Sequence, residues 1–139
     1  MPEWEVWNAI RDVSLEDLVT SRSGELEMTI EPNGENLSVG QRQLFCLARA
    51  LLRGSKVIVL DEATASVDKA TDDLIQATLR RQQGVTMLTI AHRLDTIIDY
   101  DMVCVLKDGK VVEYDNPRAL ADTKGSVFAD MWGKYQAKH

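Results

Sequence analysis

Val57-Ile-Val-Leu-Asp-Glu62 decides the fold of this chain, because an unbroken aliphatic run leads directly into two carboxylates. A short run of this kind is typical of a parallel strand that is buried on both faces. The pattern then predicts a helix over residues 69–81 and a second buried strand over residues 86–91. This strand–helix–strand order favours an α/β fold with a parallel sheet as its core.

The residues before this unit are predicted to be helical. Apolar residues recur every three positions from Trp4 to Val13, which indicates the first of two short helices within residues 3–22. Further along, Ser38 is followed three residues later by Gln41, the pattern of a capping box. A longer helix should begin there and end at Gly54.

The residues after the second strand predict a different local structure. Aliphatic residues flank Lys107-Asp-Gly-Lys110, and Asp-Gly is a strong signal for a two-residue hairpin turn. Beyond it, Asn116 as cap and Pro117 as first helical residue predict the first of two carboxyl-terminal helices.

Composition narrows the classes of partner. The chain has 139 residues and a formal net charge of -6, so its overall charge gives no reason to expect nucleic acid as a partner. Its longest aliphatic run, residues 57–60, is far shorter than the roughly 18 apolar residues that a membrane helix needs. We therefore expect no membrane segment within the chain. Cys46 and Cys104 are predicted to be buried free thiols. The amino-terminal tryptophans are expected in the core, and the acidic pair Asp72-Asp73 on a solvated helix face.

Asp61 and Glu62 are the first candidate catalytic pair. In open α/β sheets, ligands bind beyond the carboxyl ends of the strands, where both residues fall. Because successive strand residues point in opposite directions, one carboxylate could face a magnesium ion while the other faces an attacking water. The alternative is that Asp61 caps a turn and Glu62 is simply solvated.

His92 follows the second predicted strand and should reach the same edge of the sheet. There it could donate a hydrogen bond to a terminal phosphate. Alone, a histidine after a strand is equally consistent with a structural role.

The turn from Ser38 to Gln41 is a candidate anion site. Unpaired N–H groups and the helix dipole favour an anion there, Gly40 permits close approach, and Ser38 adds a hydroxyl. The alternative is an ordinary capped helix.

These segments resemble the ATP-binding-cassette (ABC) family in order and spacing. The resemblance rests on Leu37-Ser-Val-Gly-Gln-Arg-Gln43, Val57-Ile-Val-Leu-Asp-Glu-Ala-Thr-Ala-Ser-Val-Asp68 and Ala91-His-Arg-Leu94, and extends from about residue 3 to residue 135. Within the family, the chain is most similar to the second nucleotide-binding domain of multidrug-resistance-associated exporters, because Glu62 is present.

The resemblance implies a role for each residue. Asp61 would order Mg²⁺, Glu62 would polarise the attacking water and His92 would be the switch histidine. The nucleotide-contacting residues, which include the signature motif and the dimer-contact aspartate, would be Ser38, Val39, Gly40, Gln41 and Asp68. ATP and Mg²⁺ are the implied cofactors. A second nucleotide-binding domain, in a head-to-tail dimer, and transmembrane domains are the implied partners, with no nucleic acid.

The family's phosphate-binding loop is missing from the 139 residues, because Gly-x-x-x-x-Gly-Lys-Ser/Thr occurs nowhere in them. The chain thus resembles the carboxyl-terminal half of a truncated P-loop NTPase-like domain. Residues 1–54 would form a helical signature subdomain, and residues 55–139 the sheet core, hairpin and final helices. We expect it to be inactive alone, with weak or absent ATP binding and marginal stability.

The implied function is part of the ATP-hydrolysing domain of an exporter at the cytoplasmic face of a membrane. One alternative is an interaction module, or a truncated gene product, that only contributes its signature face in trans. Another is a chromosome-maintenance or repair ATPase, which would share the signature and the acidic pair. Within transport, another ABC subfamily is the further alternative.

Overall fold

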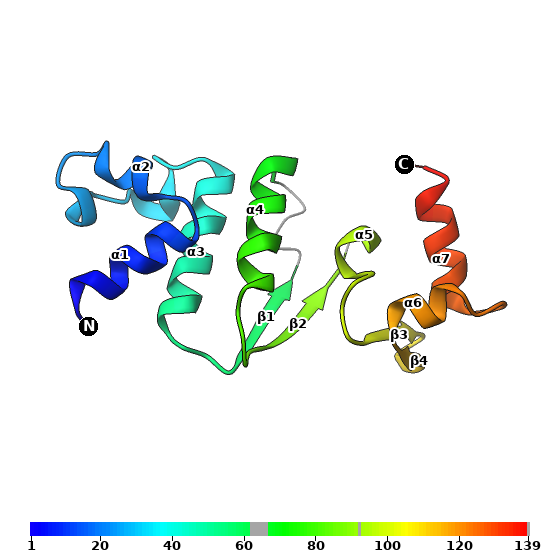
Figure 1. Ribbon diagram of the computed structural model, residues 1–139. Helices are drawn as coiled ribbons and strands as arrows, with labels where there is room; N and C mark the ends of the chain where they lie inside the picture. The colour runs from blue at the N-terminus through cyan, green and yellow to red at the C-terminus, as the bar shows by residue number, and fades with distance from the viewer. Residues whose placement is uncertain (62–66, 92, 139) are drawn as a thin grey trace. The chain divides into compact units, whose positions relative to one another are not determined.

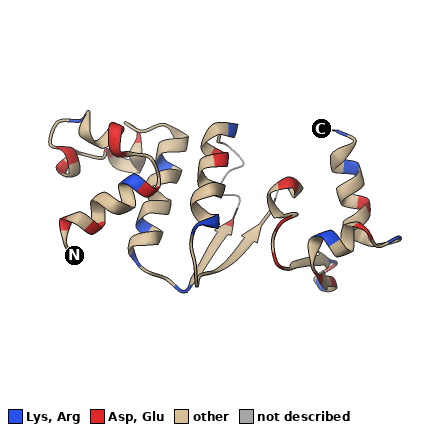
Figure 2. Cartoon of the chain, in the orientation of Figure 1, with Lys and Arg blue, Asp and Glu red and all other residues tan. Residues whose placement is uncertain are grey.

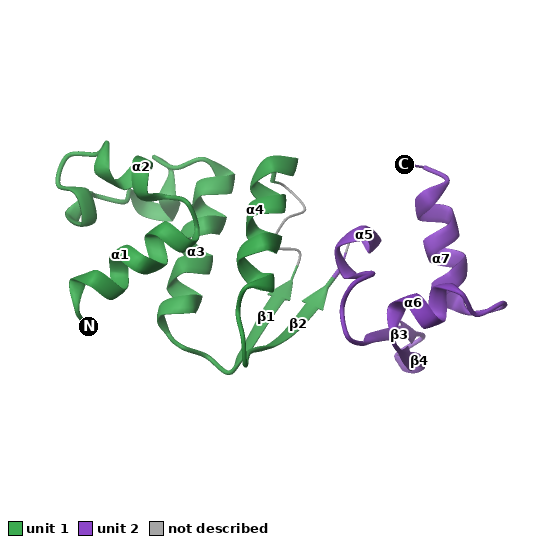
Figure 3. Ribbon diagram, in the orientation of Figure 1, with its two compact units in different colours: residues 1–90 green, residues 91–139 purple. Residues whose placement is uncertain are grey.

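The computed structural model describes residues 1–61, 67–91 and 93–138, and it divides into two compact units (Figure 3). Unit 1 is Met1–Ile90 and unit 2 is Ala91–His139. Unit 1 contains helices and a parallel strand pair, whereas unit 2 contains helices and an antiparallel hairpin. The subdomain boundary predicted at residue 54 stays a prediction.

Unit 1 follows the order that the sequence predicted (Figure 1). Its elements are α1 (Glu3–Asp12), α2 (Glu16–Thr20), the 3-10 turns η1 (Glu25–Glu27) and η2 (Pro32–Gly34), α3 (Val39–Leu52), β1 (Val57–Asp61), α4 (Lys69–Arg80) and β2 (Thr86–Ile90). The strand–helix–strand core and the preceding helices are confirmed.

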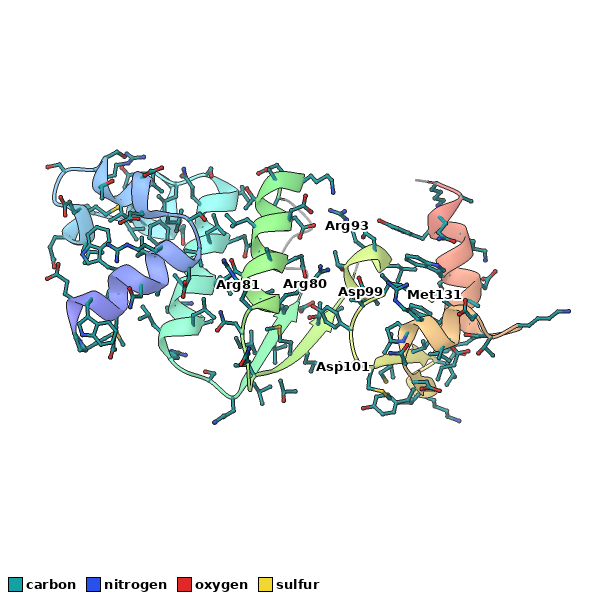
Figure 4. The ribbon with its side chains drawn as sticks, in the orientation of Figure 1. Arg80, Arg81, Arg93, Asp99, Asp101 and Met131 are labelled. Atoms are coloured by element: carbon teal, nitrogen blue, oxygen red, sulfur yellow. The ribbon has the colours of Figure 1, made fainter. Side chains whose placement is uncertain are left out.

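The core of unit 1 lies among α1, α2, α3 and α4. Val13, Val19 and Leu79 are its most deeply buried aliphatic side chains. A polar contact joins α4 to α1 within this core: the Thr78 hydroxyl donates to the Asp12 carbonyl at 3.0 Å. Arg81, at the end of α4 (Figure 4), donates to the same carbonyl at 3.2 Å. This contact fixes the last turn of α1 against α4.

The strands β1 and β2 are parallel, with a register that runs from Val57 opposite Thr86 to Asp61 opposite Ile90. The prediction that both faces are buried is wrong. Ile58 is 6% exposed, whereas Val59 and Leu88 are each 60% exposed. One face of the pair packs into the unit and the other presents aliphatic side chains to solvent.

Three further expectations are also corrected. Asp72, expected on a solvated helix face, is only 1% exposed, because it lies on the side of α4 that packs into the core. Cys46 and Cys104 are both exposed rather than buried. Trp4 is 62% exposed and so lies outside the core that its periodicity predicted.

Unit 2 contains α5 (Leu94–Ile97), β3 (Val103–Lys107), β4 (Lys110–Asp115), α6 (Pro117–Ala121) and α7 (Val127–Gln136). The predicted hairpin is confirmed: β3 and β4 are antiparallel, and Asp108 and Gly109 both have positive φ, at 51° and 73°. This is the backbone of a tight hairpin turn. The predicted cap is confirmed as well, since Asn116 Oδ1 accepts the Arg118 N–H at 3.0 Å.

Charge is distributed unevenly along the chain. Residues 1–36 hold nine Asp and Glu against two Arg, and Figure 2 shows these acidic positions over α1, α2 and their connecting turns. The net negative charge therefore resides mostly in this segment. Among the residues that the structure describes, no helix has the length and apolar character required to cross a membrane.

Candidate functional site

Several candidate residues lie toward the same end of unit 1. Both strand arrows point toward this end, and α3 and α4 begin there (Figure 1). Asp61 is the last residue of β1, the turn from Ser38 to Gln41 begins α3, and Asp68 begins α4. The strand-end carboxylate and the two helix starts are thus directed toward the end at which ligands of parallel sheets bind.

Asp61 is exposed at the end of β1, on the same face as the exposed Val59. It lies opposite Ile90 on β2, so the two strands end level with each other. Glu62 directly follows Asp61 and His92 comes two residues after Ile90, but both lie outside the described residues. The predicted meeting of these three side chains therefore stays a prediction.

The start of α3 is a capping box, as predicted. The Gln41 N–H donates to Ser38 Oγ at 3.1 Å, and the Ser38 N–H donates to Gln41 Oε1 at 2.9 Å. The Gln41 side chain is thus held on its own helix. Within the described residues, the N–H groups of Val39 and Gly40 have no acceptor, which leaves two donors at the positive end of the helix dipole.

Asp68 is the N-cap of α4. Its Oδ2 accepts the Thr71 N–H at 3.0 Å, and its Oδ1 accepts the Thr71 hydroxyl at 2.8 Å. These two bonds from Thr71, the backbone one first, lower the pKa of Asp68 below its ordinary value. The carboxylate is therefore ionised at neutral pH, and it is exposed at the helix start.

Gly40 lies directly against Thr71. A β-carbon placed on Gly40 would be 3.2 Å from both Cγ2 and Oγ1 of Thr71, which is tighter than ordinary van der Waals contact. A side chain at position 40 would therefore require Thr71 to shift by a few tenths of an ångström, because α3 and α4 approach closely here. The Thr71 side chain touches the turn at Gly40 on one side and Asp68 on the other.

The sequence matches known proteins across this region. A family model described as "ABC transporter" matches residues 2–65. "ABC transporter C family member 13" of Oryza sativa is 47% identical over 135 residues, which cover 96% of this chain and 9% of that protein. "ATP-binding cassette sub-family C member 4" of Homo sapiens is 48% identical over 128 residues, covering 91% and 10% respectively.

The chain belongs to the ABC transporter family. A further relative, "ABC transporter C family member 3" of Dictyostelium discoideum, is 54% identical over 117 residues, which cover 84% of this chain and 8% of that protein. The chain therefore spans about a tenth of the length of the curated ABC transporters that it matches.

Membership of this family implies ATP binding, and Mg²⁺ is the ion that accompanies ATP in phosphoryl transfer. Within the described ranges, no three His, Cys, Asp or Glu side chains gather closely enough to form a metal cage. Mg²⁺ bound with nucleotide needs only one or two carboxylates, since phosphate and water oxygens complete its octahedron. Asp61, exposed at the end of β1, suits that limited role.

Two side-chain clusters were not predicted from the sequence. The first is Thr71 with Asp68; the pattern Asp-x-x-Thr ahead of an apolar helix could have revealed it. The second lies in unit 2, beside His92 in the sequence. There Arg93 (Figure 4) pairs with Asp95 at 2.8 Å, and Asp95 interacts with the Tyr135 hydroxyl of α7. No local sequence pattern connects residues 95 and 135.

Proposed function

We propose that this chain is part of the ATP-hydrolysing domain of a C-family ABC transporter, in which ATP binding and hydrolysis drive transport across a membrane. The observation that carries the proposal is 47% identity to C-family members over 135 residues. The position of Asp61 at the end of a parallel strand and the capping box that begins α3 support it.

The proposed chemistry is phosphoryl transfer to water. Mg²⁺, when bound with ATP, neutralises charge on the phosphate oxygens. We assign Asp61 to hold that ion, Glu62 to orient and polarise the attacking water, and His92 to donate a hydrogen bond to the terminal phosphate. Positioning and charge stabilisation supply most of the rate enhancement in such reactions, so these side chains need not form covalent bonds to the substrate.

The proposed partner is a second nucleotide-binding domain, arranged head to tail. Val39 and Gly40 would donate their N–H groups to the terminal phosphate of an ATP held by that partner, and Ser38 would add its hydroxyl. Gln41 would act mainly by fixing the turn, because its side chain already accepts the Ser38 N–H. Asp68 would contact the partner across the same interface.

In the assembled transporter, the domain would lie at the cytoplasmic face of a membrane, joined to transmembrane domains. Supporting this location, the relatives named above are ABC transporters about ten times as long as this chain. The transported substrate would be selected by the transmembrane domains.

Tight binding of ATP by these 139 residues alone is not expected. They contain no Gly-x-x-x-x-Gly-Lys-Ser/Thr loop, whose amides and lysine provide the strongest contacts to the phosphates. Isothermal titration with Mg-ATP should detect weak binding or none. A tight one-to-one complex would contradict the proposed division of the nucleotide site.

An ATPase assay tests the proposed chemistry. Residues 1–139 are joined to the phosphate-loop segment of a C-family ABC transporter, and hydrolysis is measured with and without Glu62→Gln. Loss of the polarising carboxylate should lower the turnover by about 100-fold or more. Asp73→Asn is the control, since Asp73 is exposed and pairs only loosely with Lys69 at 3.5 Å. Equal turnover in the Glu62 variant would favour a non-catalytic interaction module.

A further inference from the structure

Thr71 makes two contacts through one short side chain. Its hydroxyl donates to Asp68 Oδ1 at 2.8 Å. The same hydroxyl oxygen and the methyl carbon both border the space above Gly40, 3.2 Å from where a β-carbon would lie. These contacts connect the start of α4 with the start of α3, the helix that precedes it in the chain.

The Thr71 side chain is stiff. A β-branched residue in a helix has few accessible χ1 rotamers, and threonine divides between those that suit its hydroxyl. The bond to Asp68 selects one of them. The rotamer that points the hydroxyl at Asp68 therefore also fixes where the methyl group lies against Gly40. Rotating the hydroxyl away from Asp68 would move the methyl group.

The Gly40 side of this contact is close: a β-carbon there would lie 3.2 Å from both the hydroxyl oxygen and the methyl carbon of Thr71. A change in the Thr71 rotamer therefore changes which atoms border the α3 turn. That turn carries the Val39 and Gly40 N–H groups, which have no acceptor among the described residues. Thr71 thus lies between the Asp68 carboxylate and the turn that carries these donors.

We propose that Thr71 is a positioning residue that couples the Asp68 carboxylate to the turn at Gly40. When a partner withdraws Asp68 from Thr71, the side chain reorients and the N–H donors of Val39 and Gly40 shift. Formation of the partner contact at Asp68 is thereby reported to the phosphate-contacting turn. The coupling is a property of this chain; its meaning for ATP hydrolysis rests on the proposed function.

The coupling is measurable by NMR on the full chain, with protonation of Asp68 standing in for a partner. In the wild type, the Gly40 amide shift should follow the titration of Asp68 with the same midpoint. Thr71→Val keeps the shape of the side chain but removes the hydroxyl, so the midpoint of Asp68 should rise and the Gly40 response should disappear. Thr71→Ser keeps the hydroxyl and should restore the low midpoint.

A matched control is Thr123→Val, which removes an exposed hydroxyl that bonds to the Ala119 carbonyl of α6. It should leave the titrations of both Asp68 and Gly40 unchanged. A Gly40 amide that follows Asp68 equally well in Thr71→Val would overturn the proposal, as would a wild-type Gly40 amide that does not respond.

Packing provides a second, independent test by urea unfolding. Gly40→Ala places a β-carbon against Thr71, and Thr71→Ala removes both atoms that it would meet. The double variant should therefore unfold at a higher urea concentration than the sum of the two single effects predicts. Strict additivity would overturn the claimed contact.

Association with an ATP-loaded partner domain separates this inference from the proposed function. If the wild type shows the NMR coupling and does not associate, the proposed function fails while the role of Thr71 stands. If the wild type associates and its Gly40 amide ignores Asp68, the proposed function is supported and the coupling is refuted.

Discussion

Glu113 on β4 accepts the backbone N–H of Val127, in the first turn of α7, at 2.6 Å. Its other oxygen accepts the Phe128 N–H at 3.0 Å and the Ser126 hydroxyl at 3.0 Å. One carboxylate thus satisfies three donors at a helix start whose N–H groups have no partner within the helix. Because Phe128 is completely buried, this contact anchors the hairpin to the core of unit 2.

This anchor should make unit 2 sensitive to acid. Burial alone would raise the pKa of Glu113, but bonds from the Phe128 and Val127 amides and from Ser126 outweigh it and lower the pKa. A carboxyl whose pKa is lowered in the folded state stabilises that state at pH values above its unfolded pKa, about 4.3. This contribution is lost as the pH falls through the folded pKa. Glu113→Gln should therefore speed hydrogen exchange at Phe128 at neutral pH and weaken its acid dependence.

Asp130→Asn is the control for this prediction. Asp130 lies on the same helix and pairs with Lys134 at 2.7 Å, but both side chains are more than 60% exposed. Exposed pairs of this kind contribute little, so exchange at Phe128 should change only slightly. Equal acceleration in both variants would show that Glu113 has no special anchoring role.

Neighbouring residues of β1 should differ strongly in how far replacement by threonine lowers the free energy of unfolding. Ile58→Thr places a hydroxyl in the core and should lower the free energy of unfolding by about 2 kcal/mol. Val59→Thr, at a position that is 60% exposed, should change it by less than about 0.5 kcal/mol and reduce aggregation. Urea unfolding and light scattering measure the two effects. Equal destabilisation would contradict the one-sided burial of this strand.

The contact between α1 and α4 should depend on a single hydroxyl. Thr78 is fully buried and donates to the Asp12 carbonyl, which keeps only the Arg81 bond when the hydroxyl is removed. Thr78→Val should therefore cost about 1 kcal/mol in urea unfolding. An unchanged midpoint would mean that Arg81 alone satisfies the carbonyl.

Tyr135 and Asp95 should shift each other's titration in unit 2. Burial raises the pKa of Asp95, but bonds from Arg93 and then Tyr135 outweigh it, so the pKa is lowered. Burial and Asp95 in turn raise the pKa of Tyr135. Tyr135→Phe should raise the pKa of Asp95, and Asp95→Asn should lower that of Tyr135. NMR of the Asp95 carboxyl and absorbance of the Tyr135 phenolate measure the two pKa values. If neither substitution shifts the pKa of the other residue, the interaction between Asp95 and Tyr135 is contradicted.

Local signals in the sequence were sufficient for most elements of the fold. The Asp108-Gly109 turn, the Asn116 cap and the Ser38–Gln41 capping box form as predicted, because each depends on residues within a few positions of one another. Burial was predicted less well. Val59 belongs to an aliphatic run, but only one side of that run finds packing partners within unit 1.

The residues of the candidate site also divide into those that the local sequence could place and those that it could not. Ser38 and Gln41 could be paired from their spacing, and Asp61 could be placed from the strand that precedes it. The contact of Gly40 with Thr71 depends on how closely two helices approach, which periodicity does not encode. The roles assigned to Glu62 and His92 come from the family resemblance and stay predictions.

Sedimentation of the chain with an ATP-loaded nucleotide-binding domain of a C-family ABC transporter tests the central claim most directly. If the α3 turn contacts a phosphate held by the partner, a complex should form with Mg-ATP and weaken at least about tenfold without nucleotide or in Gly40→Asp, whose carboxylate would repel the phosphate. Association that is equally strong without nucleotide, or unaffected by Gly40→Asp, would contradict it.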